Sequence, residues 1–238
     1  MRTLTVLSVG LVLVGISSGL TGCGGSQQQA REPEDLAIHT YVIDGLKVQT
    51  GDLICTTTGG RSVFAGFLWR VFGMVIPGPV DHIAVYVGPG GRCVEAGAQL
   101  RVITFDITGN TWDDLKMVAV RGPLFDTFYG VVYPLAGRSL SGEEEARIRR
   151  SVARYCLRQA AAGKPYNPLF TESRTDKAFY CSQLAYKAYL EEGIDLNTGQ
   201  GVPDIEGTDS IVFPEEIWAG CVHERAPEPP PGKKKWVP

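Results

Sequence analysis

The sequence has few of the residues from which metal sites and nucleic-acid-binding surfaces are built. Its 238 residues contain only three histidines and no CxxC pair or Cys/His cluster, which argues against structural zinc. Lysine and arginine number 23 against 26 aspartates and glutamates, and the net charge of −3 gives no support for a nucleic-acid partner. No unit of about 20–50 residues is repeated, so a solenoid is not expected. The composition therefore predicts a globular protein, and we expect no cofactor.

A long apolar run is also missing. The apolar residues 4–16 are too few to cross a bilayer, which takes about 20 residues, but they suit the core of a signal peptide. Leu20-Thr21-Gly22-Cys23 resembles the bacterial lipobox, and the resemblance implies cleavage before Cys23 with a diacylglycerol on its sulfur. A plain secretory signal with a free Cys23 is the alternative. The chain is thus expected to be a lipoprotein of the bacterial cell envelope, anchored to a membrane and facing the periplasm or the exterior.

The chain is predicted to have four parts. Residues 1–22 form the signal peptide, and residues 23–35 form a polar, lipidated tether. Residues 36–224 form one folded domain, and residues 225–238, which are rich in proline and lysine, form a disordered tail.

Export implies an oxidising compartment, in which disulfides can form. The chain after Cys23 has an odd number of cysteines, so at least one thiol stays unpaired or pairs between molecules. The sequence leaves their pairing open; these residues are Cys55, Cys93, Cys156, Cys181 and Cys221.

The pattern of elements predicts an α+β fold with an antiparallel sheet packed against helices. Strands are expected mainly in the first half, at residues 51–55, 81–88, 92–96, 101–107 and 116–121, followed by a loop rich in Phe, Tyr and Gly. Helices are expected in the second half. Ser141 and Glu144 form a capping box that opens a long helix to about Ala162, and Pro214 begins a short helix that reaches Trp218.

The residues around Cys181 predict a nucleophile at the start of a helix. Apolar residues recur behind it at helical spacing, namely Leu184, Ala185, Ala188 and Tyr189. A helix N-terminus carries unpaired N–H groups and a partial positive charge, which favour a thiolate. The backbone N–H groups of Cys181 and Ser182 would stabilise the oxyanion of a tetrahedral intermediate. Packing in the core is the other interpretation of this cysteine.

A cysteine nucleophile needs a base, and His82 is the preferred one. It stands at the start of a predicted strand and beside a Gly/Pro-rich loop, where a side chain can face a cleft. His39 lies near the tether and His223 near the tail, so both are expected to be peripheral. A structural or solvated histidine is the alternative interpretation of His82.

Glu95 is the predicted partner that orients the base. A four-residue turn at 88–91 places Ala84 opposite Glu95, and the alternation of side chains puts His82 on the same face. A register shift of one residue would turn Glu95 to the other face, where it would be an ordinary surface charge. The sequence therefore predicts a hydrogen bond between His82 and Glu95.

Four segments in this order carry a family resemblance: Gly51-Asp52-Leu53-Ile54, Asp81-His82-Ile83-Ala84-Val85-Tyr86-Val87-Gly88, Val94-Glu95-Ala96 and Tyr180-Cys181-Ser182-Gln183-Leu184. Together they resemble the circularly permuted branch of the NlpC papain-like superfamily, which includes the YiiX-like amidases and lecithin–retinol acyltransferase. In that branch the histidine strand precedes the cysteine helix. The resemblance implies a permuted papain-like fold with Cys181 as nucleophile, His82 as base and Glu95 as third member. Asn167 departs from the family pattern, in which this position is often acidic.

Cys55 is the rival nucleophile, since a cysteine before the histidine would be the unpermuted order. It ends a strand and lacks an adjacent helix N-terminus, so Cys181 is preferred.

Three functions are compatible with these residues. The first is a cell-envelope thiol hydrolase that cleaves amide bonds, with peptides of the cell wall as substrates, through a Cys-His-Glu triad and an acyl-thioester. The second is an acyltransferase, thioesterase or lipase acting on lipid or acylated substrates. Its acyl groove would be lined by Phe64, Phe67, Trp69, Phe72 and Met74. The third is a non-catalytic lipoprotein that binds envelope peptides or a partner.

Overall fold

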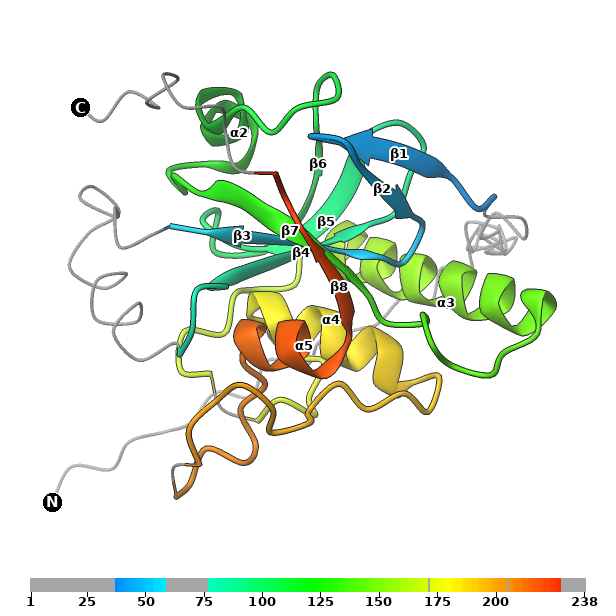
Figure 1. The fold of residues 1–238 in the computed structure, drawn as a ribbon. Helices are drawn as coiled ribbons and strands as arrows, with labels where there is room; N and C mark the ends of the chain where they lie inside the picture. The colour runs from blue at the N-terminus through cyan, green and yellow to red at the C-terminus, as the bar shows by residue number, and fades with distance from the viewer. Residues whose placement is uncertain (1–36, 59–76, 171, 205, 228–238) are drawn as a thin grey trace, which may run out of the picture. The chain divides into compact units, whose positions relative to one another are not determined.

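A six-stranded antiparallel sheet with strand order β6-β5-β4-β3-β7-β8 forms the centre of the fold (Figure 1). The computed structural model describes residues 37–58, 77–170, 172–204 and 206–227. The predicted signal peptide, the tether with Cys23 and the predicted acyl-groove residues Phe64, Phe67, Trp69, Phe72 and Met74 lie outside these residues. The strands of the sheet are β3 (Leu53–Thr57), β4 (His82–Tyr86), β5 (Arg92–Ala96), β6 (Val102–Asp106), β7 (Thr127–Tyr133) and β8 (Val222–Arg225).

The remaining elements cover the two faces of this sheet. A separate hairpin consists of β1 (Thr40–Ile43) and β2 (Leu46–Gln49). The helices within the described residues are α2 (Asp114–Arg121), α3 (Gly142–Ala161), α4 (Cys181–Leu190) and α5 (Pro214–Gly220). Figure 1 shows α3, α4 and α5 on one side of the sheet, with α2 and the β1–β2 hairpin on the other. The predicted α+β class with an antiparallel sheet is confirmed.

Alternation along the strands builds two apolar layers. On β4, Ile83 and Val85 pack toward α3 and α4, while Ala84 and Tyr86 pack toward the hairpin and α2. All of these side chains are buried, because the central strands are covered on both faces. A polar side chain on β4 must therefore find a partner inside the protein.

Two of the predicted helix starts are confirmed. The Ser141 hydroxyl accepts the Glu144 N–H at 3.2 Å, and the Glu144 carboxylate accepts the Ser141 N–H at 2.9 Å. Both contacts satisfy N–H groups that have no acceptor inside α3. Pro214 is the first residue of α5, where its missing N–H costs nothing.

Residues 116–121, which we predicted to be a strand, belong to helix α2. The valines of this segment favour a strand, but Asp113 caps a helix in front of it. The Asp113 carboxylate accepts the N–H groups of Leu115 and Lys116 at 3.1 and 3.2 Å. The buried residues of α2 are Met117 and Arg121, four positions apart, as a helix requires.

The loop predicted after residue 121 is also partly wrong. Its residues Thr127–Tyr133 form strand β7, which lies between β3 and β8 in the sheet. The prediction of a loop rested on the Phe, Tyr and Gly content of this segment, which includes Gly130. In the sheet it allows close approach, because a Cβ there would clash with the Glu224 carbonyl oxygen and lie 2.8 Å from the Trp218 ring. Strand β8 continues to Arg225, and the Ala226 N–H donates to a β7 carbonyl oxygen, so the fold extends past the predicted boundary at residue 224.

None of the helices in the described ranges combines the length and the apolar character that crossing a membrane requires.

Candidate active site

Cys181 is the first residue of helix α4, as predicted, and the chain around it is held on both sides. The preceding Tyr180 accepts the Val212 N–H through its hydroxyl at 2.9 Å. The following Ser182 donates its hydroxyl to the Val212 carbonyl oxygen at 2.6 Å. Cys181 is buried, with 5% of its surface exposed, and belongs to neither of the two apolar core clusters. The first N–H groups of α4 have no acceptor inside the helix and are therefore oriented to stabilise an anion.

A short bridge brings the start of α4 to the end of β5. Tyr166 pairs with Phe179 in parallel, and the Asn167 N–H donates to the Phe179 carbonyl oxygen at 2.9 Å. On its other side, the Tyr166 N–H donates to the Leu100 carbonyl oxygen at 2.8 Å. Leu100 follows β5 by only four residues, so these bonds connect Cys181 to the β5 end of the sheet.

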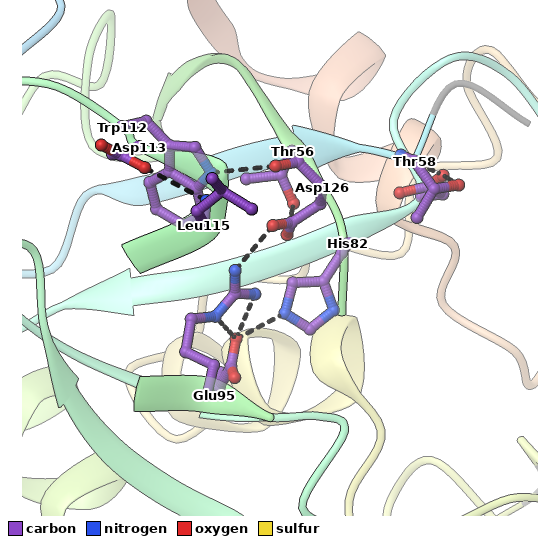
Figure 2. Close-up of polar contacts among 10 residues, drawn as sticks. Thr56, Thr58, His82, Glu95, Trp112, Asp113, Leu115 and Asp126 are labelled. Atoms are coloured by element: carbon purple, nitrogen blue, oxygen red, sulfur yellow. Dashed lines mark hydrogen bonds and ion pairs between the residues drawn. The ribbon is translucent and has the colours of Figure 1, made fainter. Parts of the chain in front are cut away.

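The hairpin of β4 and β5 has the predicted register. Val85 pairs with Val94 and Tyr86 with Cys93, which continues to place Ala84 opposite Glu95. The predicted hydrogen bond is confirmed, with 2.7 Å between Nε2 of His82 and Oε2 of Glu95 (Figure 2). Since an ionised carboxylate only accepts, the hydrogen of this bond lies on Nε2. The other ring nitrogen, Nδ1, is left for a second partner.

Cys181 lies beside His82, because its charge is the largest of the influences that raise the pKa of His82. Burial alone would lower the pKa of His82, but its interactions with Cys181 and with the Glu95 carboxylate raise it to about 10. An imidazolium at neutral pH stabilises a thiolate beside it. The structure thus brings together all three residues that the sequence singled out.

Glu95 is completely buried, and a fourth residue explains how it can stay ionised. Burial raises the pKa of Glu95, but the Arg121 guanidinium, and then the His82 imidazolium, lower it to about 2. Arg121 donates to Oε2 of Glu95 from Nε at 2.9 Å and from Nη2 at 2.7 Å. Its Nη1 donates to Asp126 at 2.7 Å, and Asp126 in turn accepts the Thr56 hydroxyl at 2.5 Å (Figure 2).

Arg121 and Asp126 were missed in the sequence because nothing local marks them. Arginine is rarely buried, and Arg121 ended a segment that we predicted to be a strand. The signal that was present is the helix cap at Asp113, since a helix starting there turns Met117 and Arg121 inward together.

The other thiols in the described part of the chain are unsuited to nucleophilic attack. The five cysteines there are free, and burial raises the pKa of Cys55, Cys93, Cys156 and Cys221. The rival nucleophile Cys55 is fully buried in the core layer under α4. A thiol kept protonated in this way is a poor nucleophile.

Among the described residues, the remaining candidates form their hydrogen bonds and ring contacts with residues other than Cys181, His82 and Glu95. The His39 ring packs against Gly88 at the turn of the hairpin, and His223 on β8 is exposed and stacks on Trp218. The Asn167 side chain, which departs from the family pattern, contacts Gln183 at 3.4 Å. Asp81, beside His82, accepts both the N–H and the hydroxyl of Thr58. These contacts hold the loops that surround the site.

Gly97 lies against the site and gives a steric test of it. A Cβ at this position would be 2.9 Å from Oε1 of Glu95 and 3.5 Å from Cε1 of His82. We expect Gly97→Ala to displace the Glu95 carboxylate and to lower the rate of thiol alkylation at Cys181 by about tenfold, the effect of about 1.4 kcal/mol. Gly142→Ala is the control, because a Cβ there meets nothing within 4 Å. An unchanged alkylation rate in Gly97→Ala would contradict this geometry.

Comparisons of the chain with models of known families, with curated proteins and with solved structures give no match. The site consists of a thiol at the N-terminus of a helix, an imidazole beside it and a carboxylate hydrogen-bonded to that imidazole. These are the parts that acyl transfer through a cysteine requires.

Proposed function

We propose that this protein is a thiol hydrolase that cleaves amide bonds. The observation that carries the proposal is the placement of Cys181 beside His82, together with the hydrogen bond from His82 to Glu95. The raised pKa of His82, which comes from its interactions with Cys181 and Glu95 against the effect of burial, supports an imidazolium beside the Cys181 sulfur in the resting site. We propose Cys181 as the nucleophile and His82 as the proton carrier.

The reaction proceeds in two halves. The Cys181 sulfur attacks the amide carbonyl carbon, and the N–H groups of Cys181 and Ser182 stabilise the resulting oxyanion. The C–N bond then breaks as His82 gives its proton to the leaving amine, which leaves an acyl-thioester. In the second half His82 takes a proton from water, the hydroxide attacks the thioester carbonyl, and the C–S bond breaks. The products are an amine and a carboxylic acid, and the thiolate is restored.

The fold and the cellular setting are part of the same proposal. A histidine strand that precedes the cysteine helix supports membership in the permuted branch of the NlpC papain-like superfamily. We propose that a lipid on Cys23 anchors the enzyme in the bacterial cell envelope. We propose that amide bonds of cell-wall peptides, which lie within reach of such an anchor, are the substrates.

The first test is the reactivity of the thiols. We expect iodoacetamide at mildly acidic pH to alkylate Cys181 at least about tenfold faster than the other thiols, because the imidazolium of His82 keeps its sulfur reactive. Tryptic mass spectrometry gives the rate at each cysteine. The His82→Ala variant is the matched comparison, and in it Cys181 should be alkylated no faster than the other thiols. Equal rates at all cysteines of the native protein would argue for the non-catalytic binding function.

The substrate class needs a second experiment. The protein is incubated with cell-wall peptide fragments, with phospholipid vesicles and with acyl thioesters, and adducts on Cys181 are read by mass spectrometry. A peptidyl adduct and release of an amine support the amidase. A fatty-acyl adduct formed from lipid, with no adduct formed from peptides, would instead indicate that the protein is an acyltransferase or lipase.

A further inference from the structure

The Arg121 side chain lies in the interior of the protein and is held there on several sides. Its side chain is completely buried, and its guanidinium lies 5.0 Å from the Phe105 ring centre and 4.9 Å from the Trp112 ring centre. These aromatic faces attract the cation and restrict its position. Arg121 ends α2, Phe105 belongs to β6 and Trp112 precedes α2, so three parts of the chain determine where the guanidinium lies.

The position of the guanidinium determines which oxygen of Glu95 is used. Oε2 accepts three hydrogens, two from Arg121 and one from His82, at 2.7 to 2.9 Å. Oε1 is buried and has no hydrogen-bond partner within the described part of the protein. The carboxylate is therefore held through a single oxygen, and that oxygen is the one that faces the imidazole.

Asp126 completes the arrangement on the far side of Arg121. It accepts from Nη1, which is pointed away from Glu95, and it is held by the Thr56 hydroxyl on β3. The fork of an arginine can bond two carboxylates at once, whereas the ammonium of lysine cannot reproduce that planar geometry. Arg121 is thus fixed at both ends of its guanidinium.

We propose that Arg121 is a positioning residue of the active site, which holds Oε2 of Glu95 where it receives the N–H of His82. This inference rests on the proposed function for its catalytic meaning. Among the described residues, Arg121 forms no hydrogen bond with Cys181 or His82, so it acts through Glu95. Removing it leaves a buried carboxylate that, among the described residues, is hydrogen-bonded only to the imidazole.

The groups around Glu95 determine the sign of the effect. Arg121 supplies the largest electrostatic stabilisation of the ionised form, and burial opposes it. Without Arg121 the pKa of Glu95 therefore rises. The strand on the other side, β6, adds no charge, because it places Ile103 opposite Glu95. Within the described residues, the titratable or charged groups that interact with Glu95 are His82 on β4, Arg121 on α2, Tyr166 on the bridge and Cys93 on β5 itself, while Asp126 lies on the far side of Arg121.

A matched control exists in Arg149. This arginine is also buried and also spans two carboxylates, with 2.8 Å to both Asp52 and Glu145. Its partners do not include His82 or Glu95 in the part of the chain that the structure describes. Arg149→Met therefore removes a comparable buried ion pair and leaves the contacts of His82 and Glu95 unchanged.

The test follows the Glu95 carboxyl group by carbon-13 NMR in the full-length protein, with its resonance assigned from the Glu95→Gln variant. In the native protein Glu95 should stay ionised down to about pH 3. In Arg121→Met we expect its pKa to be about one to three units higher, and in Arg149→Met we expect no change. An unchanged titration in folded Arg121→Met, or an equal change in both variants, would overturn the proposal.

A second measurement does not depend on the stability of Arg121→Met alone. The alkylation rate of Cys181 is compared between Glu95→Gln and the double variant Glu95→Gln/Arg121→Met, in which both charges of the pair are removed. If Arg121 acts through Glu95, the second substitution adds no further loss. A further loss of about tenfold would show that Arg121 acts on the site by another route and would overturn the proposal.

The enzymatic readout separates this inference from the proposed function. Arg121→Lys should recover part of the alkylation rate and of kcat that Arg121→Met loses, with KM unchanged, because Arg121 does not touch the substrate. If the native protein hydrolyses no amide while Glu95 titrates as described, the proposed function fails and the electrostatic role of Arg121 stands. If hydrolysis occurs and Glu95 is unaffected by Arg121, only the positioning role fails.

Discussion

Replacing Cys181 with alanine is expected to abolish amide hydrolysis, with a fall in kcat of at least about 10³-fold. The reason is that the substitution removes the atom that forms the acyl-thioester, which no neighbouring group can replace. The fold should persist, because Cys181 belongs to neither of the two apolar core clusters and alanine is a good helix former. Hydrolysis of a chromogenic or amine-releasing substrate measures the loss, and circular dichroism confirms that the variant is folded.

Cys156→Ala is the control for this experiment. Cys156 is also a buried, free cysteine, but it lies on α3 and its pKa is raised by burial. The control should keep its activity and lose only about 1 kcal/mol of unfolding free energy from the small cavity. Native-like hydrolysis by Cys181→Ala would remove this cysteine as nucleophile and the proposed mechanism with it.

Glu95→Ala is expected to have the largest effect on stability, with a loss of about 3–5 kcal/mol in the free energy of unfolding. Glu95 is completely buried between His82 and Arg121, so its removal leaves two buried cationic groups without their shared carboxylate. Urea unfolding at pH 7 measures this loss. The variant should also lose thiol reactivity at Cys181, because the imidazole is no longer oriented.

Glu145→Ala is the control, since Glu145 also pairs with a buried arginine but is 39% exposed at its side chain. Solvent screens that pair, and the expected cost is below about 1 kcal/mol. Equal costs for the two substitutions would mean that the buried network around Glu95 is not tightly coupled.

The same variant tests the pH dependence of stability. The pKa of Glu95 is lowered to about 2 in the folded protein, against about 4.3 in the unfolded chain. Ionised Glu95 therefore contributes fully to the free energy of unfolding above about pH 4.3, and this contribution is lost as the pH falls toward 2. The folded-state pKa of His82 is raised to about 10, so its contribution is complete below about 6.5 and is lost as the pH rises toward 10. In Glu95→Ala, which removes one partner of the pair, the free energy of unfolding should change less with pH in both of these ranges.

Local rules were sufficient for several parts of the fold. The turn at Gly88–Pro89–Gly90–Gly91 has few ways to connect two strands, and the alternation of β4 and β5 then determined which residues face each other. The start of α3 followed from the Ser141 capping box, and the start of α5 from Pro214. In each case the deciding contact lies within a few residues along the chain.

The errors arose where a distant contact overrode a local preference. The valines of α2 favour a strand, but the cap at Asp113 and the buried ion pairs of Arg121 stabilise a helix. Gly130 favours a turn, but the close approach of β8 and of Trp218 requires a residue without a side chain inside a strand. Neither β8 nor Trp218 is near β7 in the sequence, so the pattern around Gly130 carried no trace of them.

The sequence by itself determined the three side chains of the candidate site and the pairing of His82 with Glu95. That pairing depends on strand periodicity and turn length, which are local properties. Only the tertiary structure decided that Cys181 lies beside the His82 ring, and that Arg121 and Asp126 lie behind Glu95 and stabilise its charge. These contacts join residues far apart in the chain. They exist because burial of a carboxylate demands compensating charge, and the fold, rather than any short motif, supplies it.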